Sequence, residues 1–170
     1  MKPVIVVMGV CGAGKSTVGA ALAQRLDATF VDSDSLHPQA NVEKMAAGNP
    51  LTDEDRWPWL DLVGAELASE HPTGIIVACS ALKRVYRDAI RAKAPATMFV
   101  QLSVDLPLLQ TRVAERPGHF MPPSLLTSQL ETLEPLQADE AGLAVATLEG
   151  VGATADTILA QLHDQQPIRA

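Results

Sequence analysis

The stretch "MGVCGAGKST", residues 8–17, holds three glycines, one lysine and two hydroxyl side chains within ten positions. It fits the pattern G-x-x-x-x-G-K-[ST], with Gly9 and Gly14 as the glycines, followed by Lys15 and Ser16. Glycines in this pattern let backbone N–H groups turn inward around the oxygens of a phosphate. The stretch therefore predicts a loop that binds the phosphates of a nucleotide.

The sequence on both sides of this loop has matching periodicity. The apolar run "VIVVM" (4–8) suits a buried parallel strand, and from Lys15 to Leu26 apolar residues recur every four positions, as on one helix face. A helix that begins at the loop directs the positive end of its dipole at a bound phosphate. We expect Lys15 to reach the β- and γ-phosphates of ATP, and the Ser16 hydroxyl to ligate Mg²⁺. The residues expected to bind the nucleotide are Gly9, Val10, Cys11, Gly12, Ala13, Gly14, Lys15, Ser16 and Thr17.

Strand and helix patterns alternate along the rest of the chain. Further strands are expected at 28–32, 75–79, 97–102 and 143–147. Helices are expected at 38–47, 58–70, 82–93, 105–116, 123–133 and 153–164. Pro58 and Pro123 are expected in first turns of helices, where a missing N–H costs nothing. The alternation predicts an α/β fold: a five-stranded parallel sheet flanked by helices.

Composition limits the classes of protein that this chain can belong to. Its 170 residues suit one domain, and 47% hydrophobic with 19% charged residues fits a globular protein. The formal net charge of −7 argues against a nucleic-acid partner, because such proteins carry a basic face. No segment approaches the roughly 18 apolar residues of a membrane span. We therefore expect a cytoplasmic protein with no membrane partner.

Two carboxylates, Asp32 and Asp34, stand at the end of the second expected strand. Ligands bind beyond the carboxyl ends of strands in open α/β sheets. Along an extended strand, side chains at positions i and i+2 point the same way. One carboxylate can then hold a magnesium-bound water while the other accepts the proton of an attacking hydroxyl. Taken alone, the same residues would also suit a polar loop with a helix cap.

A longer segment, "DSDSLHPQANVEKMAAGNPLTDEDRWPWL" (32–60), resembles the substrate segment of gluconokinases of the small P-loop kinase type. "CSALKRVYRD" (79–88), "RVAERPGHFM" (112–121) and "SQLETLE" (128–134) resemble further segments of that family. The likeness extends over nearly the whole chain and implies a P-loop kinase fold with a small lid at 112–124. In "LEPLQADE" (133–140) the proline comes one position earlier than is usual in the family, which is expected to alter a loop before the last strand.

The resemblance implies transfer of the γ-phosphoryl group of ATP to the 6-hydroxyl of D-gluconate. Gluconate needs a cation for its carboxylate, and Arg56 is the first choice because a guanidinium binds a carboxylate through two parallel hydrogen bonds. Asp34 is expected to take or orient the hydroxyl proton, and Asp32 to act with Ser16 on Mg²⁺. Besides Asp34 and Arg56, the residues expected to bind the substrate are His37, Asn41, Ser80, Lys83, Arg87 and His119.

The family's lid segment supplies two further cations. Arg112 and Arg116 are one helical turn apart, so both are expected to face the phosphates when the lid closes. With Lys15 they would neutralise charge in the transition state and help to exclude water. Adenine is expected near 148–153. Relatives in the family are often dimers, so a homodimer is a further expectation.

Two other functions compete with this interpretation. Another small-metabolite kinase of the same fold, such as a shikimate kinase, would also suit "FVDSD" (30–34), but it usually carries a glycine run where this chain has "CSALK" (79–83). A nucleotide-binding switch without turnover would be free to lose some of the lysine, serine, aspartates and lid arginines named above. All of them are present in this chain.

Overall fold

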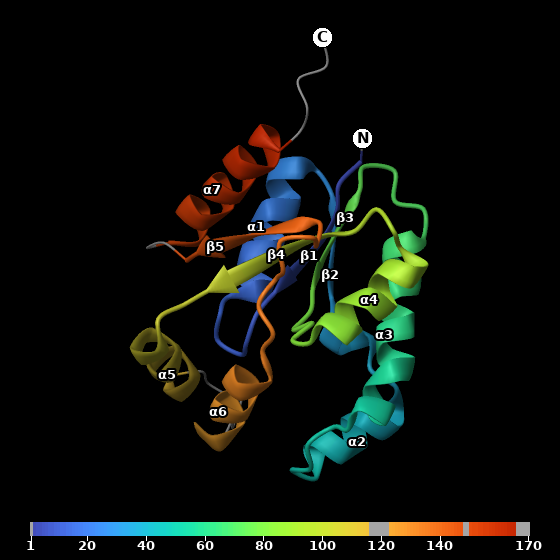
Figure 1. The fold of residues 1–170 in the computed structure, drawn as a ribbon, viewed down its shortest axis with the longest axis vertical. Helices are drawn as coiled ribbons and strands as arrows, with labels where there is room; N and C mark the ends of the chain where they lie inside the picture. The colour runs from blue at the N-terminus through green and yellow to red at the C-terminus, as the bar shows by residue number, and fades with distance from the viewer. Residues whose placement is uncertain (1, 116–122, 148–149, 166–170) are drawn as a thin grey trace.

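The computed structural model describes residues 2–115, 123–147 and 150–165. Within these residues, five parallel strands form one sheet in the order β2-β3-β1-β4-β5 (Figure 1). The strands are β1 (Val4–Met8), β2 (Thr29–Asp32), β3 (Ile75–Ala78), β4 (Met98–Ser103) and β5 (Gly142–Ala146). The helices are α1 (Lys15–Leu26), α2 (Gln39–Ala46), α3 (Asp53–Ala68), α4 (Arg84–Lys93), α5 (Leu106–Ala114), α6 (Pro123–Thr132) and α7 (Val151–Asp164), and the 3₁₀ helix η1 covers Ser33–Leu36. The five-stranded parallel sheet predicted from the sequence is confirmed.

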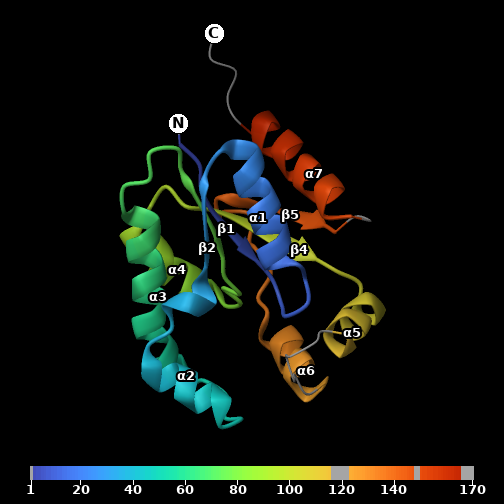
Figure 2. The ribbon, with the colours of Figure 1, turned by 180° about the vertical axis from the view of Figure 1, so that it is seen from behind.

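Strand β1 lies at the centre of the sheet because both of its faces are apolar. Ile5 and Val7 pack with α1 and α7, whereas Val6 and Met8 pack with α3 and α4. The two views of the ribbon show these helix pairs on opposite faces of the sheet (Figures 1 and 2). This burial on both faces brings the loop after β1 to the middle of the sheet's carboxyl edge.

Helix α3 begins five residues earlier than expected from Pro58. Thr52 caps the helix: its Oγ1 accepts a hydrogen bond from the Asp55 N–H at 3.2 Å, and Asp55 Oδ2 accepts one from the Thr52 N–H at 2.8 Å. This capping box satisfies two N–H groups and outweighs the one helix hydrogen bond that Pro58 removes. Pro58 therefore lies inside the helix rather than in its first turn. Pro123 begins α6, as expected.

The lid expected at 112–124 is only partly described. Arg112 lies in α5, and α6 follows from Pro123, while Arg116 and His119 lie outside the described residues. In the described part of the chain, no helix is both long and apolar enough to cross a bilayer.

Candidate active site

A cavity of about 1580 Å³ opens at the carboxyl edge of the sheet. Residues 11–18 of the loop and the start of α1 form its floor, and Asp32, Asp34 and Ser80 from the ends of neighbouring strands form one wall. Helices α2 and α6 line it as well, and both ribbon views show them standing apart beyond this edge (Figures 1 and 2). Residues far apart in the sequence therefore share one site.

The loop after β1 has the shape that phosphate binding requires. Gly12 and Gly14 have φ values of 79° and 92°, in the left-handed region that side chains rarely adopt. A Cβ atom on Gly12 would lie 3.2 Å from Val113 of α5, so this turn is also tightly packed. Lys15 Nζ donates to the Val10 carbonyl at 2.9 Å, which holds the ammonium group over the first half of the loop.

The Ser16 hydroxyl and the two aspartates form a connected group. Ser16 Oγ donates to Asp32 Oδ2 at 2.6 Å, and the Asp34 N–H donates to Asp32 Oδ1 at 3.0 Å. Asp34 does not continue the strand, because β2 ends at Asp32 and the chain enters η1. Asp32 and Asp34 are thus positioned by a turn that the Asp32 side chain caps, and not by the alternation of side chains along an extended strand. Both carboxylates nevertheless line the cavity.

Arg56 belongs to a charged cluster around the ring of Tyr86. Arg56 Nη1 donates to the Tyr86 hydroxyl at 3.2 Å, and that hydroxyl donates to Asp53. Lys83 Nζ lies 3.3 Å from Asp53 Oδ2, and the Arg56 and Lys83 cations each lie 5.5 Å from the centre of the Tyr86 ring. The hydrogen bond from Tyr86, together with the two cations, lowers the pKa of Asp53, although burial acts in the opposite direction. Two cations and one carboxylate leave this cluster one positive charge.

Arg56 and Tyr86 line the cavity, whereas Lys83 and Asp53 are not among the described residues that do so. The sequence reasoning missed both Tyr86 and Asp53. Asp53 stands inside the family segment 32–60, so its position was a signal for it. Tyr86 also stands inside a family segment, 79–88, but that segment does not reveal its partner, because packing of α4 on α3 brings its hydroxyl to Arg56.

His37 also lines the cavity, on the side of α3. Its ring stacks on Trp59 with 4.2 Å between ring centres, and Trp59 Nε1 donates to the Ser33 carbonyl at 2.8 Å. Burial lowers the pKa of His37; Asp34 opposes this effect and Arg56 adds to it. His37 Nδ1 lies 3.3 Å from Asn41 Nδ2, which can only donate, so the ring proton is assigned to Nε2. A neutral imidazole of this kind can hydrogen-bond a substrate hydroxyl.

Asn41 is not brought to the cavity among the described residues. It is buried, and Nδ2 donates to the Asp55 carbonyl at 2.8 Å. This hydrogen bond joins α2 to the first turn of α3. Asn41 therefore orients the ring of His37 and does not face a substrate.

Arg87 is not brought to the cavity either, because its side chain is completely buried. Its guanidinium makes two parallel hydrogen bonds to Glu140, at 2.7 and 2.9 Å. The remaining N–H groups donate to backbone carbonyls, including those of Ala81 at 3.0 Å and Glu134 at 3.0 Å. Ala81 has a φ of 44°, which is strained for a residue with a side chain. Arg87 therefore holds the loop that carries Ser80 instead of binding a substrate itself.

We expect the Glu140 carboxylate to make stability depend on pH. Burial raises the pKa of Glu140, but hydrogen bonds from Arg87, the Gln137 N–H and Arg91 outweigh it and lower the pKa from 4.5 to about 2. Because the folded-state pKa is the lower one, this stabilisation is present above pH 4.5 and is lost as pH falls toward about 2. Urea unfolding of wild type and Glu140→Gln should therefore differ most near neutral pH, and the difference should shrink in acid. A difference in stability between the two proteins that does not change with pH would contradict the role assigned to the Glu140 carboxylate.

Arg112, which stands in the segment expected to form the lid, reaches the loop from α5. Its Nη1 donates to the Gly12 carbonyl at 3.3 Å, and the side chain lines the cavity. Thr147 lines the same cavity, as do Gly150 and Val151, which belong to the segment 148–153 expected to lie near adenine.

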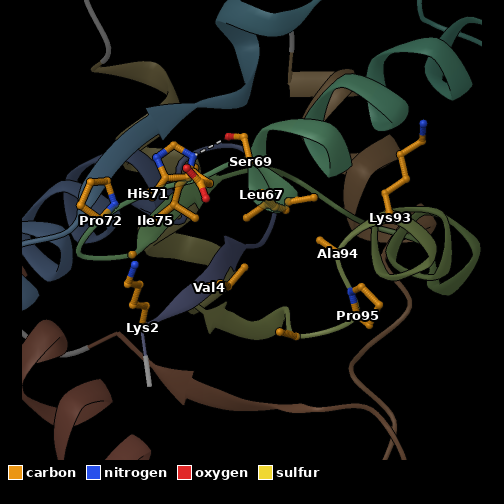
Figure 3. Close-up of a pocket in the computed structure, with 14 residues that line it drawn as sticks. Lys2, Val4, Leu67, Ser69, His71, Pro72, Ile75, Lys93, Ala94 and Pro95 are labelled. Carbon is orange, nitrogen blue, oxygen red and sulfur yellow. Dashed lines mark hydrogen bonds between the residues drawn. The ribbon is translucent and has the colours of Figure 1, made fainter.

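A second hollow, of about 580 Å³, lies at the opposite edge of the sheet (Figure 3). Val4 and Ile75, at the amino ends of β1 and β3, line it. His71, one of the polar residues that line it, is already hydrogen-bonded to the Ser69 hydroxyl at 2.9 Å and to the Glu66 carbonyl at 3.0 Å. This hollow has neither a phosphate loop nor paired carboxylates, so we place the chemistry in the larger cavity.

Comparison with known proteins gives the family. A family model described as "AAA domain" matches residues 4–136. The gluconokinase of Gluconobacter oxydans (strain 621H) is 48% identical over 145 residues, which are 82% of this chain and 80% of that protein. The chain belongs to the gluconokinase family. The crystal structure of a gluconokinase from Sinorhizobium meliloti 1021 is similar too: it is 46% identical, the match covers 94% of this chain and 91% of that one, and the TM-score is 0.85.

The gluconokinase family shares its fold with other small kinases. A shikimate kinase from Acinetobacter baumannii in complex with shikimate covers 98% of this chain and 96% of its own, with a TM-score of 0.69 at 22% identity. At that identity the likeness shows the fold alone. The family assignment therefore rests on the gluconokinases of higher identity.

Proposed function

We propose that this member of the gluconokinase family transfers the γ-phosphoryl group of ATP to the 6-hydroxyl of D-gluconate, which yields 6-phospho-D-gluconate and ADP. One observation carries the proposal: the phosphate-binding loop, the carboxylate of Asp34 and the guanidinium of Arg56 line a single cavity. A nucleotide on the loop and a sugar acid on Arg56 would then meet beside a carboxylate. Family membership supplies the identity of the sugar acid.

The loop residues are suited to hold ATP with Mg²⁺. A hydroxyl and a carboxylate oxygen 2.6 Å apart, on Ser16 and Asp32, are the hard oxygen donors that Mg²⁺ prefers. We assign the metal to this pair, with Ser16 in contact and Asp32 acting through a bound water. When bound, Mg²⁺ would neutralise charge on the β- and γ-phosphates. Lys15 would contribute the same kind of stabilisation by swinging from the Val10 carbonyl to those phosphates.

Asp34 is proposed to orient the 6-hydroxyl and to accept its proton as the new O–P bond forms. Because phosphoryl transfer passes through a loose transition state, alignment of the hydroxyl contributes more than the strength of the base. Asp34 is fixed for this task by its own N–H, which is bonded to Asp32. Arg112, and Arg116 outside the described residues, are proposed to cover the phosphates from the lid side.

Arg56 is proposed to bind the gluconate carboxylate. Asp53 and Tyr86 engage one edge of its guanidinium through Nη1, which leaves its other N–H groups to form a bidentate pair. The cluster has a net charge of one positive unit, which matches one carboxylate. Lys83 contributes to that charge through its ion pair with Asp53. His37 and Ser80 are proposed to bind the hydroxyl groups of gluconate.

Arg56→Lys is expected to raise the KM for gluconate by about tenfold or more, since hydrogen bonds to charged groups contribute about 1.5–3 kcal/mol. A lysine keeps the charge but cannot form the paired hydrogen bonds. The KM for ATP should not change. Arg25→Lys on α1, where Arg25 pairs with Asp156 at the surface, is the matched control and should leave both values unchanged. An unchanged gluconate KM in Arg56→Lys would contradict the role of Arg56.

The decisive experiment measures ADP release from ATP and Mg²⁺ with D-gluconate, other aldonates, shikimate, AMP or no acceptor. Strong stimulation by gluconate alone is the expected result. Stimulation by shikimate instead would reassign Arg56 and His37 to another acid, and ATP binding without stimulation by any acceptor would favour a switch. The homodimer stays a prediction that the mass of the protein in solution tests.

A further inference from the structure

One contact joins the phosphate-binding loop to a helix on the far side of the cavity. The Cys11 N–H donates to Oε1 of Gln129 at 2.6 Å, across 118 residues of sequence. Gln129 lies in α6 and lines the cavity, and none of the roles assigned above uses it. The helix is anchored independently of this contact, since Leu126 on it is buried in the main core.

The contact occupies a donor at the acceptor-facing end of the loop. The Gly9 N–H, two residues before Cys11, bonds the carbonyl of Ser80 at 3.4 Å, and Lys15 Nζ bonds the carbonyl of the adjacent Val10. Lys15 is the group that reaches the β- and γ-phosphates in such loops. The Cys11 N–H therefore stands where the terminal phosphate of a triphosphate, not its α-phosphate, is to be bound.

A terminal phosphate oxygen would compete with Gln129 for this N–H. Both acceptors need the same position, so the amide oxygen must withdraw by about one oxygen diameter when the phosphate arrives. We expect the phosphate oxygen to displace the Gln129 amide oxygen from the Cys11 N–H, because hydrogen bonds to an ionised acceptor are about twice as strong as those to a neutral one. The displaced amide also carries two N–H donors, and a half-turn about its terminal torsion, which has a broad two-fold preference, presents them in place of Oε1.

We propose that Gln129 recognises the γ-phosphate of bound ATP through a direct hydrogen bond. With the loop empty, its amide oxygen accepts from Cys11; with ATP bound, its amide N–H donates to a γ-phosphoryl oxygen and the Cys11 N–H donates to the same group. ADP lacks this group, so Gln129 discriminates ATP from ADP. This inference rests on the proposed use of ATP and extends it to a residue that the sequence motif alone did not assign.

The test compares the affinities of ADP and of a non-hydrolysable ATP analogue, each with Mg²⁺, by titration calorimetry on the full chain. In Gln129→Glu the side chain keeps its shape but places a carboxylate against the γ-phosphate. We expect the Kd of the ATP analogue to rise at least about tenfold, from like-charge repulsion at short range, and that of ADP by less than about threefold. Gln129→Ala, which removes the donor without adding charge, should weaken the analogue by about three- to tenfold and leave ADP nearly unchanged.

The control is Gln161→Glu, the same substitution at an exposed position of α7, which should change neither Kd. Equal weakening of ADP and the analogue in both Gln129 variants would make Gln129 a support of the loop and would overturn the proposal, as would unchanged affinities. For the wild-type protein, binding of the ATP analogue and turnover of gluconate are measured first. Failure at that stage would overturn the proposed function itself, so the two failures are distinguishable.

Discussion

Replacing Asp34 with alanine is expected to lower kcat for gluconate phosphorylation by about 10²–10⁴-fold, the usual contribution of a positioned general base. Asp34 lines the cavity between the loop and Arg56 and is held by the hydrogen bond from its own N–H to Asp32. In the proposed mechanism, loss of the carboxylate leaves the 6-hydroxyl neither aligned nor deprotonated as it attacks. Steady-state kinetics with saturating ATP and gluconate measure the loss.

Binding of ATP should be largely preserved in this variant, because among the described residues no hydrogen bond joins the Asp34 side chain to the loop, while Asp32 and Ser16 remain in place. Calorimetry with a non-hydrolysable analogue separates this outcome from a general loss of folding. Asp61→Ala, at an exposed position of α3 outside the cavity, is the control and should turn over normally. Near-normal turnover in Asp34→Ala would contradict the role assigned to this residue.

Arg87→Met is expected to lower the free energy of unfolding by about 3–5 kcal/mol, because removing one partner of a buried ion pair leaves the other charge uncompensated. The side chains of Arg87 and Glu140 are both fully buried, and methionine cannot replace the hydrogen bonds to Glu140 and to the carbonyls of Ala81 and Glu134. Urea-induced unfolding at neutral pH measures the change.

Arg84→Met is the matched control, three residues earlier on the same helix. Arg84 pairs with Asp139 at 2.7 Å, but the carboxylate of that pair is 67% exposed. Exposed pairs contribute about 0–1 kcal/mol, so this variant should lose much less stability than Arg87→Met. Equal losses would show that burial of the Arg87–Glu140 pair is not what stabilises this region.

The sheet was predictable because its signals are local. Alternation of apolar strands with helical periodicity, and a glycine loop directly after the first strand, lie within short windows of sequence. The start of α3 is a local feature as well: Pro58 predicts a helix that begins at 58, but the Thr52 capping box, which is also visible in the sequence, makes it begin at Asp53.

The set of residues around the cavity was only partly predictable. Asp32, Asp34, His37, Arg56 and Ser80 line it, as residues next to strand ends or within a family motif. Asn41 and Arg87 also stand in such motifs, yet the structure turns their side chains to protein partners. A motif indicates that a residue type is required at a position, but not whether it faces the ligand or supports a residue that does.

By itself, the sequence determined the phosphate-binding loop, the order of strands and helices and the gluconokinase likeness, because each depends on neighbouring residues. Only the tertiary structure decided which side chains meet: Arg56 with Tyr86 across 30 residues, Arg87 with Glu140 across 53, and Cys11 with Gln129 across 118. The physical reason is that a side chain's partner is selected by how helices pack on the sheet. This packing brings together residues that no local sequence pattern connects.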